Sequence, residues 1–234
     1  MKQQNKSTFK YFIYILLYLQ NNFINTETIS IDLIKQYLPR NPIILECGAY
    51  KGEDTEKLSA KIPNATIYAF EAVPSLYKII TNKKIKNAHI FPYALGFQNG
   101  ITNFYISSGT SDGSSSILKP KKHLEDHPNV KFNNIIQVPC KTIDTWAEEN
   151  NIAKVDFLWL DMQGAEYLTL RASPKILGTV TVIQTEVSLN ESYEGVSEYP
   201  VFKRWLMDQG FKVIKEEIPW SDAGDVLFVR KTTE

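Results

Sequence analysis

The chain has 234 residues, of which 43% are hydrophobic and 22% charged, so it can bury the core of one globular domain. Lys plus Arg and Asp plus Glu each total 26, and this balance leaves no net field to attract nucleic acid. Two cysteines, one of them inside an apolar run, argue against a disulfide framework. The composition predicts a protein of a reducing compartment, the cytoplasm, without a nucleic-acid partner.

The N-terminal segment is apolar over residues 9–19 (FKYFIYILLYL) and follows Lys2 and Lys6, as the start of a secretory signal would. No small-residue cleavage site comes after it. It contains Lys10 and falls short of the ~20 apolar residues that span a bilayer, so no transmembrane span is expected. We expect residues 1–40 to form a helical extension that packs on the domain or on a second copy, giving a homo-oligomer. Association with a membrane surface is the alternative.

Residues 41–234 are predicted to form one α/β domain in which strands and helices alternate. Apolar runs predict strands at residues 43–47, 66–70, 88–91, 155–160 and 180–185. Helical patterns lie between them at residues 53–61, 75–84, 145–150 and 165–170, and Asp144 could cap the third of these. Two polar strands are expected at residues 102–106 and 135–138.

The chain ends with a predicted helix at residues 201–209 and strands at residues 211–215 and 226–229, a pattern typical of a closing antiparallel hairpin. The alternation before it implies a mainly parallel sheet with helices on both faces. Ligands of such sheets bind beyond the carboxyl ends of the strands, so the functional residues are expected there.

The first strand runs into an acidic residue and two glycines four residues apart, in the sequence Glu46-Cys47-Gly48-Ala49-Tyr50-Lys51-Gly52. Glycines at such a turn let the backbone approach a ligand closely. Dinucleotide enzymes use G-x-G-x-x-G at this place, so the G-x-x-x-G spacing favours a ligand without a pyrophosphate. The alternative is a turn that merely ends a strand and begins a helix.

The second strand ends at Glu71-Ala72, where a carboxylate can accept hydrogen bonds from both ribose hydroxyls of an adenosine ligand. The third is followed by Ala94-Leu95, where small and apolar side chains would leave room for a flat base. Alternatively, Glu71 is only a solvated strand end. Ala94-Leu95 could likewise be a plain turn.

Strand four ends in Asp161, and Glu186 follows strand five, so the two carboxylates are expected at one edge of the sheet. They could act as general base for an acceptor hydroxyl or as ligands of a divalent cation, and Asp161 could also contact the cofactor. Alternatively, Asp161 caps the next helix. His123 and His127 have the spacing of metal ligands on a helix, but they lack the Glu of H-E-x-x-H.

In order along the chain, these motifs resemble those of the FkbM-type methyltransferases over residues 43–230. Further matching segments are Ser114-Ser115-Ser116, Thr142-Ile143-Asp144 and Leu160-Asp161-Met162-Gln163-Gly164-Ala165-Glu166. The resemblance implies a Rossmann-like class I fold with a seven-stranded sheet, and S-adenosylmethionine as methyl donor. It also implies O-methylation of a hydroxyl on a sugar, glycan or small metabolite.

Two other functions compete with an O-methyltransferase. The family's first motif more often has Asp and Asn where this chain has Glu46 and Tyr50, and Glu often replaces Gln163. These departures motivate a binding or scaffold protein that has lost turnover. An NAD-dependent oxidoreductase shares the acidic strand end, but the third glycine is missing.

Overall fold

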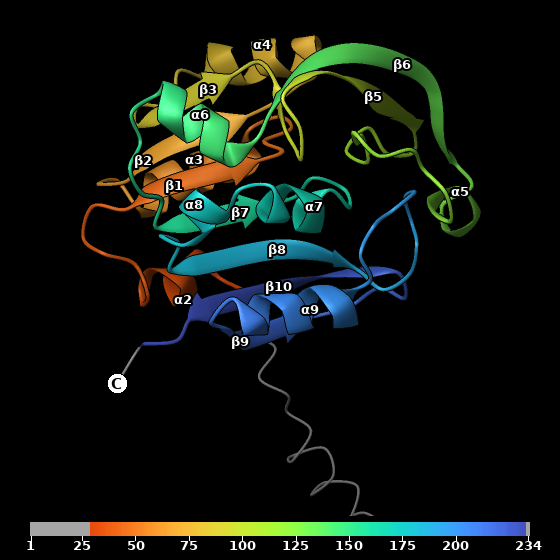
Figure 1. The fold of residues 1–234 in the computed structure, drawn as a ribbon. Helices are drawn as coiled ribbons and strands as arrows, with labels where there is room; N and C mark the ends of the chain where they lie inside the picture. Colours follow the sequence, from red (N-terminus) through yellow and green to blue (C-terminus); the bar gives the residue numbers. More distant parts are fainter. Residues whose placement is uncertain (1–28, 233–234) are drawn as a thin grey trace, which may run out of the picture.

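The computed structural model describes residues 29–232, which form a seven-stranded sheet, a three-stranded sheet and surrounding helices (Figure 1). The strand order of the larger sheet is β3-β2-β1-β7-β8-β10-β9. The parallel strands are β1 (Ile43–Cys47), β2 (Thr66–Phe70), β3 (Ala88–Phe91), β7 (Phe157–Leu160) and β8 (Val182–Ser188). β9 (Phe211–Glu217) and β10 (Ala223–Arg230) form the antiparallel C-terminal hairpin. The predicted fold class is therefore confirmed.

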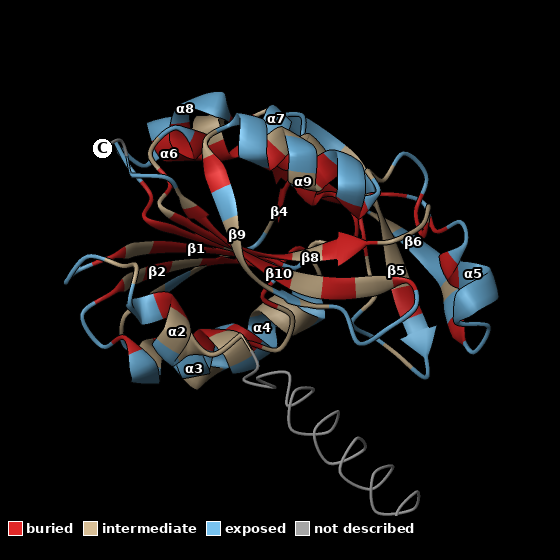
Figure 2. Ribbon diagram, turned by 90° about the horizontal axis from the view of Figure 1, so that it is seen from below, coloured by how far each residue is buried: buried red, intermediate tan, exposed pale blue. Residues whose placement is uncertain are grey.

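Helices cover both faces of this sheet (Figure 2). One face packs against α6 (Ile143–Glu149), α7 (Glu166–Arg171), α8 (Pro174–Leu177) and α9 (Tyr199–Asp208). The other packs against α2 (Ile31–Lys35), α3 (Glu53–Lys61) and α4 (Pro74–Lys83). Strands buried on both faces explain why the sequence shows short apolar runs rather than alternation.

An aromatic cluster fixes the carboxyl end of β2. The ring of Phe70 stacks on Phe91 with centroids 5.2 Å apart, and meets the edge of Trp146 at 5.1 Å. Phe70 and Trp146 are both buried. Since Glu71 directly follows Phe70, this packing holds the backbone that carries its carboxylate.

The smaller sheet consists of β4 (Ala94–Leu95), β5 (Gly100–Gly109) and β6 (Val130–Lys141), in the order β4-β6-β5. Its β5–β6 ribbon arches over the carboxyl ends of the main strands and leads to α5 (His123–Asp126) (Figure 1). There the amides of Lys121 and His123 donate to the Ser192 carbonyl, at 2.8 and 3.1 Å. The ribbon is thus tied to the segment between β8 and α9.

The structure corrects one predicted helix cap. Thr142, not Asp144, caps α6, because the Thr142 hydroxyl accepts from the amide of Thr145 at 3.1 Å. The Asp144 carboxylate instead accepts from the amides of Lys175 and Ile176 in α8, at 3.0 and 2.8 Å. Asp144 therefore serves a neighbouring helix that the sequence pattern did not reveal.

The apolar segment at residues 9–19 lies outside the described residues, so the helical extension and the homo-oligomer stay predictions, as do the cytoplasmic location and the domain boundary at residue 41. Of the predicted extension, α2 is described, and its Ile34 is fully buried against the sheet. None of the helices within residues 29–232 combines the length and apolar character needed to cross a membrane.

Candidate active site

Successive strands are added to one side of β1 as far as β3, and then to its other side from β7 onward. A pocket opens at the carboxyl ends of β1 and β7, where this order reverses. Gly48 follows β1 with φ of 92°, and a Cβ built on it would lie 1.8 Å from the carbonyl oxygen of Asp161. The amide of Asp161 in turn donates to the Cys47 carbonyl at 3.0 Å. Only glycine fits this contact, which brings the glycine loop and Asp161 together at the switch point of the sheet.

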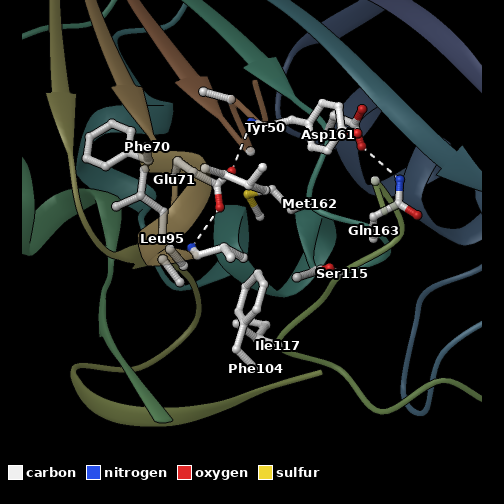
Figure 3. Close-up of a pocket in the computed structure, with 18 of the residues that line it drawn as sticks. Tyr50, Phe70, Glu71, Leu95, Phe104, Ser115, Ile117, Asp161, Met162 and Gln163 are labelled. Atoms are coloured by element: carbon white, nitrogen blue, oxygen red, sulfur yellow. Dashed lines mark hydrogen bonds between the residues drawn. The ribbon is translucent and has the colours of Figure 1, made fainter. Parts of the chain in front are cut away.

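Glu71 lies at the centre of the pocket (Figure 3). Its Oε2 accepts from the amide of Tyr50 at 2.9 Å, and its Oε1 accepts from the amide of Val73 at 2.7 Å. Burial raises the pKa of Glu71 to about 7, while these backbone donors favour the ionised form. Each carboxylate oxygen keeps a second lone pair, so Glu71 can still accept bonds from a ligand.

The pocket walls come from both sheets (Figure 3). The apolar side chains of the lining include Leu76, Leu95, Phe104, Ile117 and Met162. The carboxylates that line it are Glu53, Asp54, Glu71, Asp112 and Asp161, and no Lys, Arg or His of the described residues joins them. Asp54 and Asp112 are paired with Lys57 and Lys51, which lie outside the lining, so their charges are partly balanced. The site therefore combines apolar walls for a flat group with carboxylates, Glu71 and Asp161 among them, for a cationic or hydroxyl-bearing one.

Most of the predicted cofactor residues meet in this pocket. Gly48, Ala49, Tyr50, Glu71, Ala72, Ala94, Leu95 and Asp161 line it, whereas Glu46 and Gly52 do not, and Glu186, predicted as a catalytic carboxylate, also lies outside the lining. Glu46 lies beneath the pocket, 1% exposed, and its burial raises its pKa to about 8. Gly52, with φ of 79°, is the residue from which α3 begins. Of these residues only Gly52 belongs to the glycine loop, where it makes the turn into α3.

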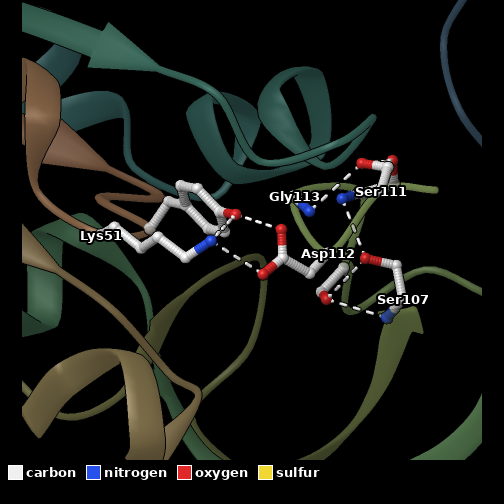
Figure 4. A network of polar contacts seen from close by, with 8 residues as sticks. Lys51, Ser107, Ser111, Asp112 and Gly113 are labelled. Carbon is white, nitrogen blue, oxygen red and sulfur yellow. Dashed lines mark hydrogen bonds and ion pairs between the residues drawn. The ribbon is translucent and has the colours of Figure 1, made fainter. Parts of the chain in front are cut away.

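A network of hydrogen bonds and an ion pair closes one side of the pocket (Figure 4). The Tyr50 hydroxyl donates to Asp112, and the Lys51 ammonium lies 2.9 Å from the other Asp112 oxygen. Behind them, the hydroxyl of Ser107 accepts from the amide of Ser114 at 2.9 Å. The Ser- and Gly-rich loop is thus fastened to the glycine loop across 62 residues of sequence.

The two carboxylates predicted to be catalytic are joined by one amide. Gln163 Nε2 donates to Asp161 Oδ1 at 2.9 Å and to Glu186 Oε2 at 2.8 Å. The pKa of Asp161 is raised because protein surrounds its carboxyl and limits its hydration, although the side chain is open to the pocket. Burial also raises the pKa of Glu186, and the charge of Asp161 adds to this effect. Both groups are therefore poised to take up a proton.

Asp161 does not cap the helix that follows it. The N-cap of α7 is Ala165, which makes no side-chain cap bond, and Glu166 Oε1 accepts from the amides of Met162 and Gly164 in the preceding loop, at 2.7 and 3.3 Å. Burial raises the pKa of Glu166 to about 7. Because Glu166 accepts from the backbone amides of this loop, the Asp161 carboxylate is not needed for them and can face the pocket.

The two histidines do not form a metal site. His123 is buried with its ring 5.3 Å from that of Tyr193, and His127 Nε2 lies 2.6 Å from Asp222. Within residues 29–232, no group of three or more His, Cys, Asp or Glu side chains is placed to hold a metal ion. The pair instead connects α5 with the start of β10.

A parallel sheet closed by an antiparallel hairpin, with a glycine loop after its first strand and an acidic residue after its second, defines a Rossmann-like ligand-binding fold. The methyltransferase FkbM domain matches residues 46–213. The chain therefore belongs to the FkbM family of methyltransferases, which take their methyl group from S-adenosylmethionine.

Two known proteins illustrate the relationship. The chain is 30% identical over 196 residues to 2-O-methyltransferase NoeI of Sinorhizobium fredii, an alignment that covers 80% of this chain and 79% of that protein. It also superposes on a chain of a fibrillarin/Nop5p complex with a TM-score of 0.50 and 16% identity, covering 86% of this chain and 79% of that one. The second likeness shows the fold alone.

Proposed function

We propose that the protein binds S-adenosylmethionine in the pocket and methylates a hydroxyl of a sugar, glycan or small metabolite. The observation that carries this proposal is the position of Glu71, held by two backbone amides at the end of β2 and beside the glycine loop. A carboxylate there suits the two ribose hydroxyls of an adenosine ligand.

The residues present fit this cofactor. Gly48 leaves a cradle that a Cβ would fill, so backbone can approach the ligand closely. Leu95 and Phe104 offer apolar surface for the adenine base. The carboxylates of Asp54 and Asp161 suit the positive charges of the sulfonium and amino groups, and they oppose the pyrophosphate of NAD.

Asp161 and Glu186 would then serve the acceptor. When bound, the cofactor supplies an electrophilic methyl group whose bond to sulfur breaks as the acceptor oxygen bonds to carbon, with the electron pair going to sulfur. The proton leaving the acceptor hydroxyl passes to the Asp161 carboxylate, which lines the pocket, while Glu186 shares the amide of Gln163 with it. Positioning by the arching β5–β6 ribbon would supply much of the remaining rate.

The acceptor class is supported by the relative's name, which specifies 2-O-methylation. The pocket also offers hydroxyl and carboxylate side chains around its rim, among them Ser115, Asp112 and Asp161. Such groups hydrogen-bond the hydroxyls of a sugar. A polyhydroxylated acceptor therefore fits the site better than an apolar one.

Calorimetric titration of the full chain with S-adenosylmethionine, S-adenosylhomocysteine and NAD tests the cofactor. Micromolar binding of the first two alone supports the proposal, whereas binding of NAD alone would favour an oxidoreductase. Transfer of a labelled methyl group to a panel of methyl glycosides, each with a free hydroxyl at C2, tests the reaction. Repeating the transfer with EDTA shows whether a divalent cation contributes. Cofactor binding without transfer to any acceptor would favour the scaffold function.

A further inference from the structure

The side chain of Gln163 occupies an unusual place between two acids. Its amide nitrogen carries two hydrogens, and these are directed to Asp161 Oδ1 at 2.9 Å and to Glu186 Oε2 at 2.8 Å. Asp161 lies on the pocket side, and Glu186 lies on the neighbouring strand β8. The neutral amide of Gln163 thus connects Glu186, which lies outside the pocket lining, with Asp161, which is part of it.

The other end of this amide contacts a buried tyrosine. Gln163 Oε1 lies 3.1 Å from the hydroxyl of Tyr193, a 2% exposed residue whose hydroxyl also lies 2.8 Å from the Ser114 carbonyl. The single hydrogen of the Tyr193 hydroxyl is shared between Gln163 Oε1 and the Ser114 carbonyl, so the two carboxylates decide the orientation of the amide. An ionised carboxylate can accept only from Nε2, because a flipped amide would direct its oxygen at the acid and lose both bonds.

The backbone at Gln163 is held in an unfavourable conformation. Its φ of 52° is left-handed, and the following Gly164 has φ of 94°. The buried hydroxyl of Ser116 donates to the Gln163 carbonyl at 2.9 Å. Such conformations are unfavourable for residues other than glycine and persist where the surroundings enforce them, often at functional sites.

Several acids surround the pair. Asp54 of α3 acts on Asp161, while Glu166 of α7 and Asp225 of β10 act on Glu186. These charges and burial raise the pKa of both carboxyls, whereas the bonds from Gln163 lower it. Gln163 therefore opposes a field that would keep the acids protonated.

We infer that Gln163 is a positioning residue, which holds Asp161 and Glu186 as one oriented pair ready to accept the acceptor's hydroxyl proton. This inference rests on the proposed function. Gln163 lines the pocket beside Asp161, but its amide hydrogens are both directed to the carboxylates, so it acts on the acceptor through them. A merely structural glutamine would shape the loop without affecting how the two acids titrate.

The test is the pH dependence of cofactor affinity, measured by calorimetry from pH 5 to 9 on the full chain. Positively charged S-adenosylmethionine should bind more tightly as the pair ionises, and S-adenosylhomocysteine, which lacks the sulfonium, should respond less. In Gln163→Met the transition should move to higher pH by about one unit, because two bonds that favour the ionised forms are lost. Tyr193→Phe should move it less in the same direction.

Gln137→Met, on the exposed surface of β6, is the matched control and should leave the transition in place. Unaltered S-adenosylhomocysteine affinity at pH 9 shows that the pocket of Gln163→Met is intact. An unmoved transition in that variant overturns the inference and leaves the proposed function standing. If Gln163→Met does not fold, Tyr193→Phe decides by the same criterion. A wild-type protein that binds neither compound overturns the proposed function, and the inference with it.

Discussion

The carboxylate of Glu71 lies 2.9 Å from the amide nitrogen of Tyr50, so one side chain joins the end of β2 to the glycine loop after β1. Because the second oxygen of Glu71 is bound by the amide of Val73, the carboxylate cannot rotate freely. A ligand that bonds to Glu71 is therefore placed relative to Gly48 and Asp161 as well. This relationship determines the first prediction.

Glu71→Gln is expected to weaken S-adenosylhomocysteine binding at pH 8 by about tenfold or more, because a charged acceptor is replaced by a neutral one. The side-chain NH2 of the glutamine would also face one of the two backbone N–H groups that now donate to Glu71, so one of these bonds would be lost. Calorimetry measures the affinity, and a thermal melt confirms that the variant folds. Glu125→Gln, exposed on α5, is the control. Unchanged affinity in folded Glu71→Gln would remove its assignment to the ribose.

The protein without cofactor should lose stability as the pH rises from 5 to 8. Burial raises the folded-state pKa of Asp225 to about 6, of Glu71 and Glu166 to about 7, and of Glu46 to about 8. Below pH 4 these groups are protonated in both states and contribute nothing to the pH dependence. Above it, the unfolded chain ionises first, so stability falls until each folded pKa is passed. Melting temperatures across this range would show the trend, and a rise instead would contradict it.

Glu46→Gln should remove the largest part of the stability that the protein loses between pH 5 and 8. Glu46 is 1% exposed, and its Oε2 has no hydrogen-bond partner among the described residues. The variant should be more stable than wild type at pH 8, by on the order of 1–5 kcal/mol, and little changed at pH 5. Denaturant unfolding at both pH values measures the difference. Glu148→Gln, exposed on α6, should be neutral at both. An equal gain at the two pH values would show that the charge of Glu46 is not the cause.

Gly48→Ala should abolish cofactor binding and destabilise the fold severely. The added methyl group would overlap the Asp161 carbonyl oxygen at 1.8 Å, and both atoms belong to backbone that cannot move independently. Gly195→Ala is the matched control, since Gly195 has a similar φ of 78° with no atom within 4 Å. It should cost only about 1–2 kcal/mol, the penalty of the left-handed conformation. Equal losses in the two variants would disprove the steric argument.

Asp112→Ala should speed the release of S-adenosylhomocysteine by about two- to fivefold. The change is modest because the Asp112 side chain is 57% exposed, and an exposed ion pair contributes little. Stopped-flow displacement measures the dissociation rate, with Asp208→Ala on α9 as control. A slower rate in Asp112→Ala would contradict a closing role for the loop.

The strands of the main sheet were predictable because each is a short apolar run between turn residues. β1, β2, β3 and α3 have the predicted bounds. The strands β5 and β6 extend well beyond the predicted residues, because a ribbon open to solvent needs no continuous apolar pattern. The short helix α8 also escaped prediction, since its four residues give no helical period.

The site was predictable where it follows the ends of strands, as at Gly48, Glu71 and Asp161. The contacts made by distant loops were not. Nothing in the sequence pairs Asp112 with Tyr50, and Gln163 attracts notice only as a departure from the family's usual residue. Such contacts depend on how the β5–β6 ribbon folds back over the sheet, which local patterns do not encode.

No ladder of backbone hydrogen bonds joins the two sheets within residues 29–232. The β5–β6 ribbon instead meets the strands carrying Glu71 and Asp161 through side chains, because Phe104 lines the pocket and Asp112 bonds to Tyr50. Exchanging residues 97–139 with those of another family member would therefore replace one wall of the pocket without breaking a strand ladder of the main sheet. A lineage could change the shape of its pocket by the same route, varying the ribbon while the main sheet stays constant.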